Sequence, residues 1–199
     1  MPDPLPRFPL LVLAGGYSRR MGRDKASLPW DDGVPLLLRV IDRLAPIASG
    51  IWVAARAGQE LPRGDYQRVD DEYPGDGPLA GLARGLAAIE DGSVAVAACD
   101  YPLADPALFP VLRAAAPAVA VVLPLFQGRA HPLMAVWRSD VASSCERALA
   151  RGARRVREVL DEVGAFEVEA GDLPGIDPER ALLNVNDPEA LERAFGRDP

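Results

Sequence analysis

The stretch Leu13-Ala-Gly-Gly-Tyr-Ser-Arg-Arg-Met-Gly-Arg-Asp-Lys25 is the part of this sequence best suited to bind an anion. Gly15 and Gly16 directly follow an apolar run, which suits a sharp turn that a ligand can approach closely. Backbone N–H groups of such a loop can surround a phosphate, and nearby cations strengthen the site. The cations of this stretch are Arg19, Arg20, Arg23 and Lys25. In an acidic chain this cluster favours phosphate binding over a merely solvated surface loop.

Two common phosphate motifs do not fit this spacing. A P-loop requires a Gly-Lys pair followed by Ser or Thr, whereas Lys25 follows Asp24 and precedes Ala26. The dinucleotide fingerprint G-x-G-x-x-G is absent as well. The stretch therefore predicts a phosphate site of another kind.

Carboxylates occur at two further places where strand-like runs end. Asp100 closes the apolar run Ser93–Cys99, and Asp70 and Asp71 come shortly before Gly77-Pro-Leu-Ala-Gly81. Such a carboxylate can cap a turn or lie in an acidic surface loop. Asp100 can also ligate Mg²⁺, which prefers oxygen donors and is often held by one or two carboxylates together with substrate phosphates. The residues alone leave these alternatives open.

The second half of the chain contains further residues that can bind an anion or a metal. His131, the only histidine, stands at a predicted strand start, where a structural role is equally compatible with its position. Arg151, Arg154, Arg155 and Arg157 form a basic run that either solvates a helix face or meets a phosphate. The segment Asn184-Val-Asn-Asp-Pro-Glu189 predicts an asparagine turn before a capped helix, and an asparagine oxygen there could reach a metal.

The elements that must position these residues alternate between strands and helices, which predicts an α/β fold with a mostly parallel sheet. In such sheets ligands bind outside the carboxyl ends of the strands, so the glycine-rich loop and Asp100 should share one edge. Asp105 and Pro106 are expected to open a helix. We expect strands over 8–14, 51–55, 67–69, 93–99, 118–125, 132–137 and 166–169. We expect helices over 35–44, 79–89, 105–115, 139–151 and 154–163, with a last helix opened by Asp187.

Composition excludes several classes of protein. The 199 residues are 49% hydrophobic and 26% charged, which suits one globular domain and not a disordered chain. A net charge of −7 argues against nucleic acid as partner, and no apolar run is long enough to span a membrane. Two cysteines and one histidine argue against a zinc site and a Ser-His-Asp hydrolase. The start of the chain does not resemble a signal peptide, so we expect a cytoplasmic protein with a flexible tail over residues 1–7.

The stretch Leu13–Lys25 resembles the L-A-x-G-x-S-x-R-M-G-x-x-K signature of nucleotidyltransferases, which transfer a nucleoside monophosphate to an acceptor phosphate. Its Gly15-Gly16 and Asp24-Lys25 pairs are most similar to the molybdenum cofactor guanylyltransferase family. Cys99-Asp-Tyr-Pro102 and Asn184–Glu189 match further motifs of that family, so the resemblance covers nearly the whole chain.

The resemblance implies a single Rossmann-like three-layer domain over residues 8–199, with nucleotide binding over 8–105 and acceptor binding over 106–199. It implies GTP and the molybdopterin cofactor as substrates, Mg²⁺ on Asp100, and proteins that deliver the cofactor or mature molybdoenzymes as partners. The implied catalytic residues are Lys25, Asp100 and Arg19. The implied nucleotide-binding residues are Leu13, Ala14, Gly15, Gly16, Gly22, Lys25, Asp71, Gly77, Pro78, Leu79 and Asp100. The implied acceptor-binding residues are His131, Arg155, Asn184 and Asn186.

The sequence departs from the family at two positions. Ala98 replaces a usual proline, and Val53-Ala-Ala-Arg56 lacks an asparagine that contacts the nucleotide in the family, with Arg56 as a candidate replacement. The alternatives are a cytidylyltransferase, which usually has alanine where Gly15 stands, and a sugar-phosphate nucleotidyltransferase. A non-catalytic cofactor carrier is a further alternative, although a carrier would need neither Lys25 nor Asp100.

Overall fold

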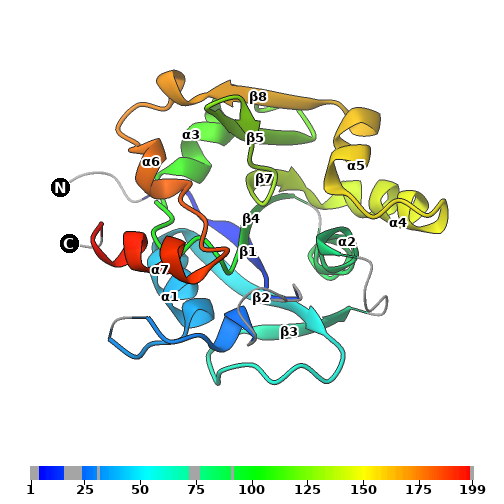
Figure 1. Ribbon diagram of the computed structural model, residues 1–199. Helices are drawn as coiled ribbons and strands as arrows, with labels where there is room; N and C mark the ends of the chain where they lie inside the picture. Colours follow the sequence, from blue (N-terminus) through cyan, green and yellow to red (C-terminus); the bar gives the residue numbers. More distant parts are fainter. Residues whose placement is uncertain (1–4, 16–23, 31, 72–76, 91, 198–199) are drawn as a thin grey trace.

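The apolar runs of the sequence form the strands of one eight-stranded sheet, with strand order β3-β2-β1-β4-β7-β5-β6 and β8 on the other edge of β5 (Figure 1). The computed structural model describes residues 5–15, 24–30, 32–71, 77–90 and 92–197. The strands are β1 (Phe8–Leu13), β2 (Ala48–Arg56), β3 (Gln67–Asp71), β4 (Ser93–Ala98), β5 (Val121–Phe126), β6 (Arg129–Ala130), β7 (Met134–Arg138) and β8 (Ala165–Glu169).

Strands β1 to β4 run in one direction, and β5 and β8 share it. β7 is antiparallel to both of its neighbours, β4 and β5, because a tight hairpin reverses the chain after β5. Gln127 and Gly128 connect β5 to β6, and both have positive φ (51° and 69°), as a two-residue hairpin turn of type I′ requires. The expected α/β fold with a mostly parallel sheet is confirmed.

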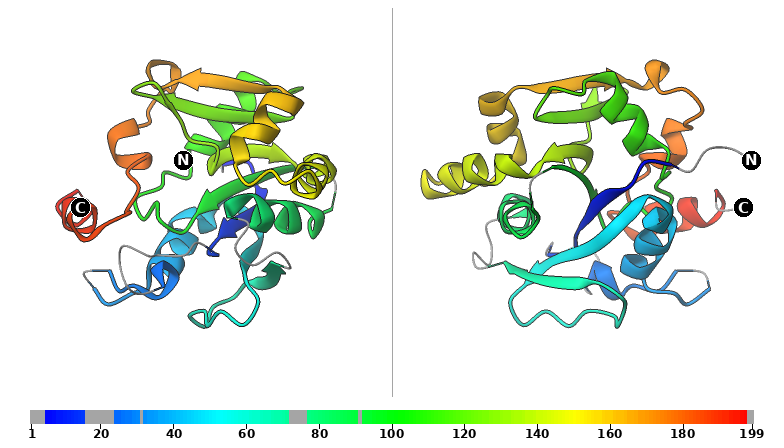
Figure 2. Two further views of the ribbon diagram at one scale, coloured as in Figure 1. Left: turned by 45° about the vertical axis from the view of Figure 1, so that its right-hand side comes forward. Right: turned by 180° about the vertical axis from the view of Figure 1, so that it is seen from behind.

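Two apolar layers enclose the sheet, because successive strand residues point to opposite faces. Leu10 and Val12 of β1 pack with α1 (Leu36–Leu44) and α3 (Leu108–Ala115), whereas Leu11 and Leu13 pack on the other face. The helices on that second face are α2 (Pro78–Ala87), α4 (Ala142–Ala150) and α5 (Val156–Val163). Figure 2 shows the sheet between these helices.

The C-terminal segment packs against the residues around Trp30, before α1. Helix α7 (Pro188–Phe195) places the Phe195 ring 4.7 Å from the Trp30 ring, edge to face. Val185 is fully buried beside Leu28 and Leu103. The segment after α6 (Pro178–Ala181) is thus fixed close to the end of β4.

Several expected boundaries are wrong. The helix expected to open at Asp105 and Pro106 begins at Leu108, because the Asp105 carboxylate accepts from Ala107 N in a preceding turn. The strand expected from residue 132 begins at Met134, and the helix expected from residue 154 begins at Val156. The sequence analysis also missed β6 and α6.

Other local expectations hold. The Asp187 carboxylate accepts from Ala190 N and caps α7, as the sequence predicted. Over the described part of the chain, the model contains no helix that is both long and apolar enough to cross a membrane.

The contact between α2 and β1 leads to a first prediction. A Cβ on Gly85 would lie 2.5 Å from Cδ2 of Leu11, which is fully buried and cannot move aside. We expect Gly85→Ala to lower the free energy of unfolding by about 1–3 kcal/mol, measured by chemical denaturation. Gly81→Ala is the control, because its Cβ would lie 3.6 Å from Ala54 Cβ, in ordinary contact. Equal stability of the two variants would contradict the close packing.

Candidate active site

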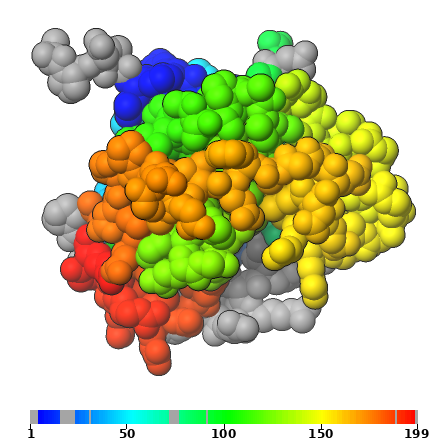
Figure 3. All heavy atoms as spheres, turned by 90° about the horizontal axis from the view of Figure 1, so that it is seen from above, coloured from blue at the N-terminus to red at the C-terminus, as the bar shows by residue number. Residues whose placement is uncertain are grey.

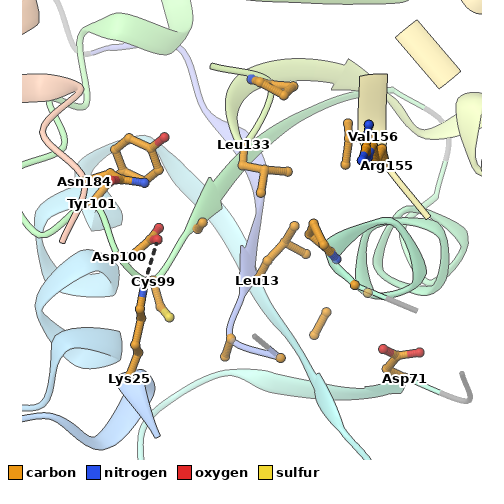
Figure 4. Close-up of a pocket in the computed structure, with 18 of the residues that line it drawn as sticks. Leu13, Lys25, Asp71, Cys99, Asp100, Tyr101, Leu133, Arg155, Val156 and Asn184 are labelled. Carbon is orange, nitrogen blue, oxygen red and sulfur yellow. Dashed lines mark hydrogen bonds and ion pairs between the residues drawn. The ribbon is translucent and has the colours of Figure 1, made fainter. Parts of the chain in front are cut away.

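A cleft of about 490 Å³ opens at the carboxyl ends of β1, β2, β3 and β4, where the topology of a parallel sheet places ligands (Figure 4). One wall carries Lys25 and Asp100, and Asp71 lies on the opposite side of the close-up. Between them the lining is small and apolar. It consists of Leu13, Ala14, Gly15, Ala54, Ala55, Pro78, Gly81, Ala98 and Cys99.

Hydrogen bonds hold the end of β1, which lines the cleft, to its neighbours. Ala14 N donates to Ala54 O at 2.8 Å, and Cys99 N donates to Leu13 O at 3.0 Å. The buried amide of Gln59 donates to Ala14 O at 3.0 Å. All three hydrogen bonds precede the glycine pair, so the loop starts from a fixed strand end.

Lys25 is the only lysine of the chain, and it points to the end of β4. Its Nζ lies 3.3 Å from Asp100 Oδ2 and donates to Asn186 Oδ1 at 2.6 Å. The short helix Lys25–Ser27 holds its backbone, with the Asp24 carboxylate accepting from Ala26 N. An ammonium held in this way can meet a negatively charged phosphate oxygen in the cleft.

Asp100 carries a charge that its surroundings disfavour. Burial raises the pKa of its carboxyl group, and the neighbouring Lys25 ammonium opposes that rise. Its Oδ1 is buried and has no hydrogen-bond partner among the described residues. That vacant oxygen fits a divalent cation, which prefers such donors. The described residues contain no group of three acidic, histidine or cysteine side chains around it, so substrate phosphates and water would complete the coordination.

The two candidate aspartates of β3 lie differently. Asp71 is 5% exposed and lines the cleft. Asp70 pairs with Arg68 at 2.8 Å, and 55% of its side chain is exposed. Neighbouring strand residues point to opposite faces, so only one of the two can face the cleft.

Arg56 occupies the segment where the family asparagine is missing. Its Nη2 lies 3.0 Å from Asp24 Oδ2, one residue before Lys25. The backbone N of Arg56 donates to the side-chain oxygen of Gln59. The side-chain nitrogen of Gln59 in turn donates to Ala14 O. Arg56 therefore ties the end of β2 to the backbone that carries Lys25, and it does not line the cleft.

Arginines also line the cleft, and Figure 4 places Arg155 on the side away from Lys25. Arg155 stands directly before α5, where the Glu158 carboxylate accepts from the backbone N of Arg154 and Arg155. Figure 3 shows the yellow segment that contains α4 at one side of the molecule. The β5–β6 hairpin carries Arg129. The arginines of this lining are Arg129, Arg154, Arg155 and Arg157.

His131 is 5% exposed and stands just before β7. Burial, followed by the charge of Arg129, lowers the pKa of His131 to about 4, so the ring is neutral at pH 7. Its Nδ1 lies 3.1 Å from the Tyr101 hydroxyl. His131 therefore contacts Tyr101, which lines the cleft, but His131 does not line the cleft.

The structure brings most predicted residues together. The cleft lining includes Leu13, Ala14, Gly15, Lys25, Asp71, Gly77, Pro78, Asp100, Arg155 and Asn184. Asn186 reaches the site through Lys25. The side chain of Leu79 does not line the cleft, because α2 directs it into the core against the sheet, where it is fully buried. Gly16, Arg19 and Gly22 lie outside the described residues.

The sequence analysis missed Tyr101, Gln59 and Arg129. The position of Tyr101 beside Asp100 was a signal for it, but Gln59 and Arg129 carried no motif. Both reach the site through the tertiary fold alone: Gln59 through Ala14 O, and Arg129 through the hairpin.

Comparisons with known proteins agree with this geometry. Residues 10–168 match the family model described as a MobA-like NTP transferase domain. A protein of Mycobacterium avium described as a probable molybdenum cofactor guanylyltransferase is 42% identical over 183 residues, covering 88% of this chain and 89% of that protein. A protein of Mycobacterium tuberculosis with the same description is 37% identical over 196 residues, covering 96% and 94%.

Solved structures share the fold. The crystal structure of molybdopterin-guanine dinucleotide biosynthesis protein A from Archaeoglobus fulgidus superposes with a TM-score of 0.83 at 25% identity, covering 96% of this chain and 98% of that one. The structure of 2-C-methyl-D-erythritol 4-phosphate cytidylyltransferase from Thermus thermophilus gives a TM-score of 0.70 at 17% identity, over 96% and 98% of the two chains. The second likeness concerns the fold alone.

The buried histidine leads to a prediction about pH. Because the pKa of His131 falls from about 6.5 to about 4 on folding, the unfolded chain binds the extra proton between these values. Its contribution to stability is therefore complete above pH 6.5 and is lost as the pH falls towards 4. We expect about 1.6 kcal/mol of the loss in unfolding free energy between pH 6.5 and pH 5 to vanish in His131→Gln. Urea titrations at both pH values measure this difference, and an unchanged pH slope in the variant would contradict it.

Proposed function

This chain belongs to the family of MobA-like NTP transferase domains, and from that premise we propose that it transfers GMP from GTP to the terminal phosphate of the molybdopterin cofactor. Its relatives support nucleotidyl transfer as the reaction class. The observation that carries the proposal is the contact of Lys25 with Asp100 at the strand ends, beside a buried carboxylate oxygen that has no described partner. A carrier that only held the finished cofactor would have no need of such a pair.

In the proposed reaction an oxygen of the acceptor phosphate attacks the α-phosphorus of GTP. A new P–O bond forms, the bond between the α-phosphorus and the oxygen that bridges to the β-phosphorus breaks, and pyrophosphate leaves with that electron pair. The acceptor phosphate is already ionised, so no general base is required. Lys25 would stabilise the charge that develops on the triphosphate, because an ammonium fixed in a half-buried site needs little reorganisation.

Asp100 would hold Mg²⁺ through its vacant oxygen. The metal would neutralise the negative charge of the triphosphate and of the leaving pyrophosphate. The pKa of Asp100 supports this role, because burial disfavours the charged carboxylate. A bound cation would add to the favourable interactions that the protein supplies, of which the charge of Lys25 is the largest.

Asp71 is the residue we propose for recognition of the base. A carboxylate accepts two hydrogen bonds, and guanine offers its N1–H and its 2-amino group side by side. Asp71 lies at the end of β3, across the small apolar lining from Lys25. A base placed against Ala54 and Ala55 would leave the phosphates directed towards Lys25.

The arginines would hold the acceptor phosphate. Their guanidinium groups suit bidentate binding of phosphate, and Arg155 lies on the side of the cleft away from Lys25. The protein's main contribution would then be the alignment of two anions that repel each other in water.

Calorimetry of nucleotide binding in the presence of Mg²⁺ tests the proposal. We expect GTP to bind more tightly than CTP or ATP, and we expect Asp100→Asn to weaken GTP binding at least tenfold. Burial raises the pKa of Asp100, so its charge opposes folding, and this variant should remain at least as stable as the wild type. Preferential binding of CTP would favour the cytidylyltransferase alternative. Binding of GTP without any transfer to the acceptor would favour the carrier.

Replacement of Lys25 tests the catalytic assignment. We expect Lys25→Ala to lower turnover by about 10²–10³-fold, the usual cost of removing one group that stabilises a transition state. Circular dichroism should report the same fold, but the thermal midpoint should fall, because Asp100 loses the cation that compensates its buried charge. Turnover is therefore compared at a temperature at which both variants are folded. The matched control is Arg39→Ala, which removes a cation that pairs with Asp32 outside the cleft. Wild-type turnover in Lys25→Ala would refute the assignment.

A further inference from the structure

The turn that follows β2 is hydrogen-bonded to both described ends of the glycine-rich loop. At the first end, Gln59 Nε2 donates to Ala14 O at 3.0 Å. At the second end, Arg56 Nη2 donates to Asp24 Oδ2 at 3.0 Å, one residue before Lys25. The same turn therefore supports the place where the loop begins and the place where it ends.

Hydrogen bonds also fix the shape of this turn. Gln59 N donates to Arg56 O, and Arg56 N donates to Gln59 Oε1, both at 3.0 Å. From β3, the two terminal nitrogens of Arg68 donate to Gln59 O at 2.7 Å and to Arg56 O at 3.0 Å. Gln59 is 7% exposed, so water has little access to compete for its side-chain hydrogen bonds. The side chain of Arg56 therefore leaves the backbone from a fixed point.

The side chain of Arg56 lies beside the first end of the loop and pairs with the second. A Cβ on Gly15 would lie 3.6 Å from Arg56 N and 3.7 Å from Arg56 Cγ, which is ordinary contact. Only 22% of the Arg56 side chain and 23% of the Asp24 side chain are exposed. Solvent therefore screens the attraction between the two charges less than it would at a fully exposed site.

Asp24 passes this restraint on to Lys25. While Asp24 Oδ2 meets Arg56, its Oδ1 accepts from Ala26 N at 3.1 Å and caps the short helix Lys25–Ser27. Both oxygens of the carboxylate thus have partners on opposite sides, which restricts its rotation. Figure 4 shows the side chain of Lys25 leaving this short helix towards Asp100. One residue therefore separates the Arg56 ion pair from the backbone that carries the ammonium group.

The ion pair also balances a charge that is unfavourable in this place. Asp24 puts a carboxylate directly before Lys25, and such a charge repels a phosphate that approaches the ammonium group. The guanidinium group of Arg56 offsets this repulsion. Arg56 itself does not line the cleft, so its effect on a bound substrate must pass through Asp24.

We propose that Arg56 is a positioning residue, which holds Asp24 and thereby the backbone from which Lys25 reaches into the cleft. This role rests on the proposed function of the same cleft. Gln59 supports it by tying the other end of the glycine-rich loop to the same turn. The charge of the guanidinium group carries the role, because it is the charge that meets Asp24.

NMR of the substrate-free protein tests the positioning without any assay of activity. Lys25 is the only lysine, so a sample labelled with ¹³C and ¹⁵N in lysine alone gives one set of side-chain signals. We expect the two Hε protons of Lys25 to have separate shifts in the wild type, because Asp100 and Asn186 hold the ammonium group. We expect this separation to be lost in Arg56→Gln, which keeps a polar side chain and loses the charge.

Two further variants make this experiment specific. Asp24→Asn should have the same effect as Arg56→Gln, because asparagine can still cap the short helix but no longer forms the ion pair. The matched control is Arg39→Gln, which breaks an Arg–Asp pair of the same length, 3.0 Å, at a side chain that is 20% exposed. It should leave the Lys25 signals unchanged. Coincident Hε signals in the wild type, or wild-type signals in Arg56→Gln, would overturn the proposal.

Steady-state transfer of GMP from GTP tests the consequence for the reaction. We expect Arg56→Gln to lower kcat on the order of tenfold, since Lys25 is misplaced but not removed. In a Lys25→Ala background the same substitution should change kcat by less than about twofold, because no ammonium group remains to be positioned. An equal loss of kcat in both backgrounds would overturn the proposal, because it would show that Arg56 acts independently of Lys25. If the wild type transfers no GMP, the proposed function fails, and the NMR experiment still decides the positioning.

Discussion

An ionised carboxylate loses most of its hydration when it stands at the end of a buried strand, and this cost organises the surroundings of Asp100. Lys25, 3.3 Å away, supplies the compensating charge from the end of the glycine-rich loop. Asn186 holds that ammonium, and Val185 N binds the backbone oxygen of Asp100 itself. Three segments that are far apart in the sequence therefore meet around one residue. These contacts offset only part of the cost of the buried charge, and Oδ1 of Asp100 has no hydrogen-bond partner among the described residues.

The mixed sheet explains why the cations of the cleft stand on two sides. The parallel strands β1 to β4 end at one edge and bring Asp71, Lys25 and Asp100 around a small apolar lining. The antiparallel hairpin and the start of α5 approach from beyond β4 and contribute the arginines. In the proposed reaction this division would let each of the two anions meet its own cations before the anions approach each other.

Local sequence rules predicted the elements better than their ends. The apolar runs gave the main strands, and the aspartate before Pro188 gave the start of α7. The same rule failed at Asp105, because its carboxylate closes a turn onto Ala107 instead of capping a helix. Both positions carry Asp followed by Pro, and only the packing of the following residues distinguishes them. The chain cannot show this packing until its layers are assembled.

For the site, the sequence by itself determined the chemistry: glycines after a strand, Lys25, and Asp100 at the end of a second strand. These signals are local, because each residue directly follows a strand. The carboxyl ends of parallel strands meet at one edge of the sheet, which brings these residues together. Only the tertiary structure decided that Asp71 faces the cleft while Asp70 pairs with Arg68 outside it. It also turned Leu79 into the core. The physical reason is that the direction of a side chain depends on strand register and on the neighbouring layer, and neither is present in a single stretch of sequence.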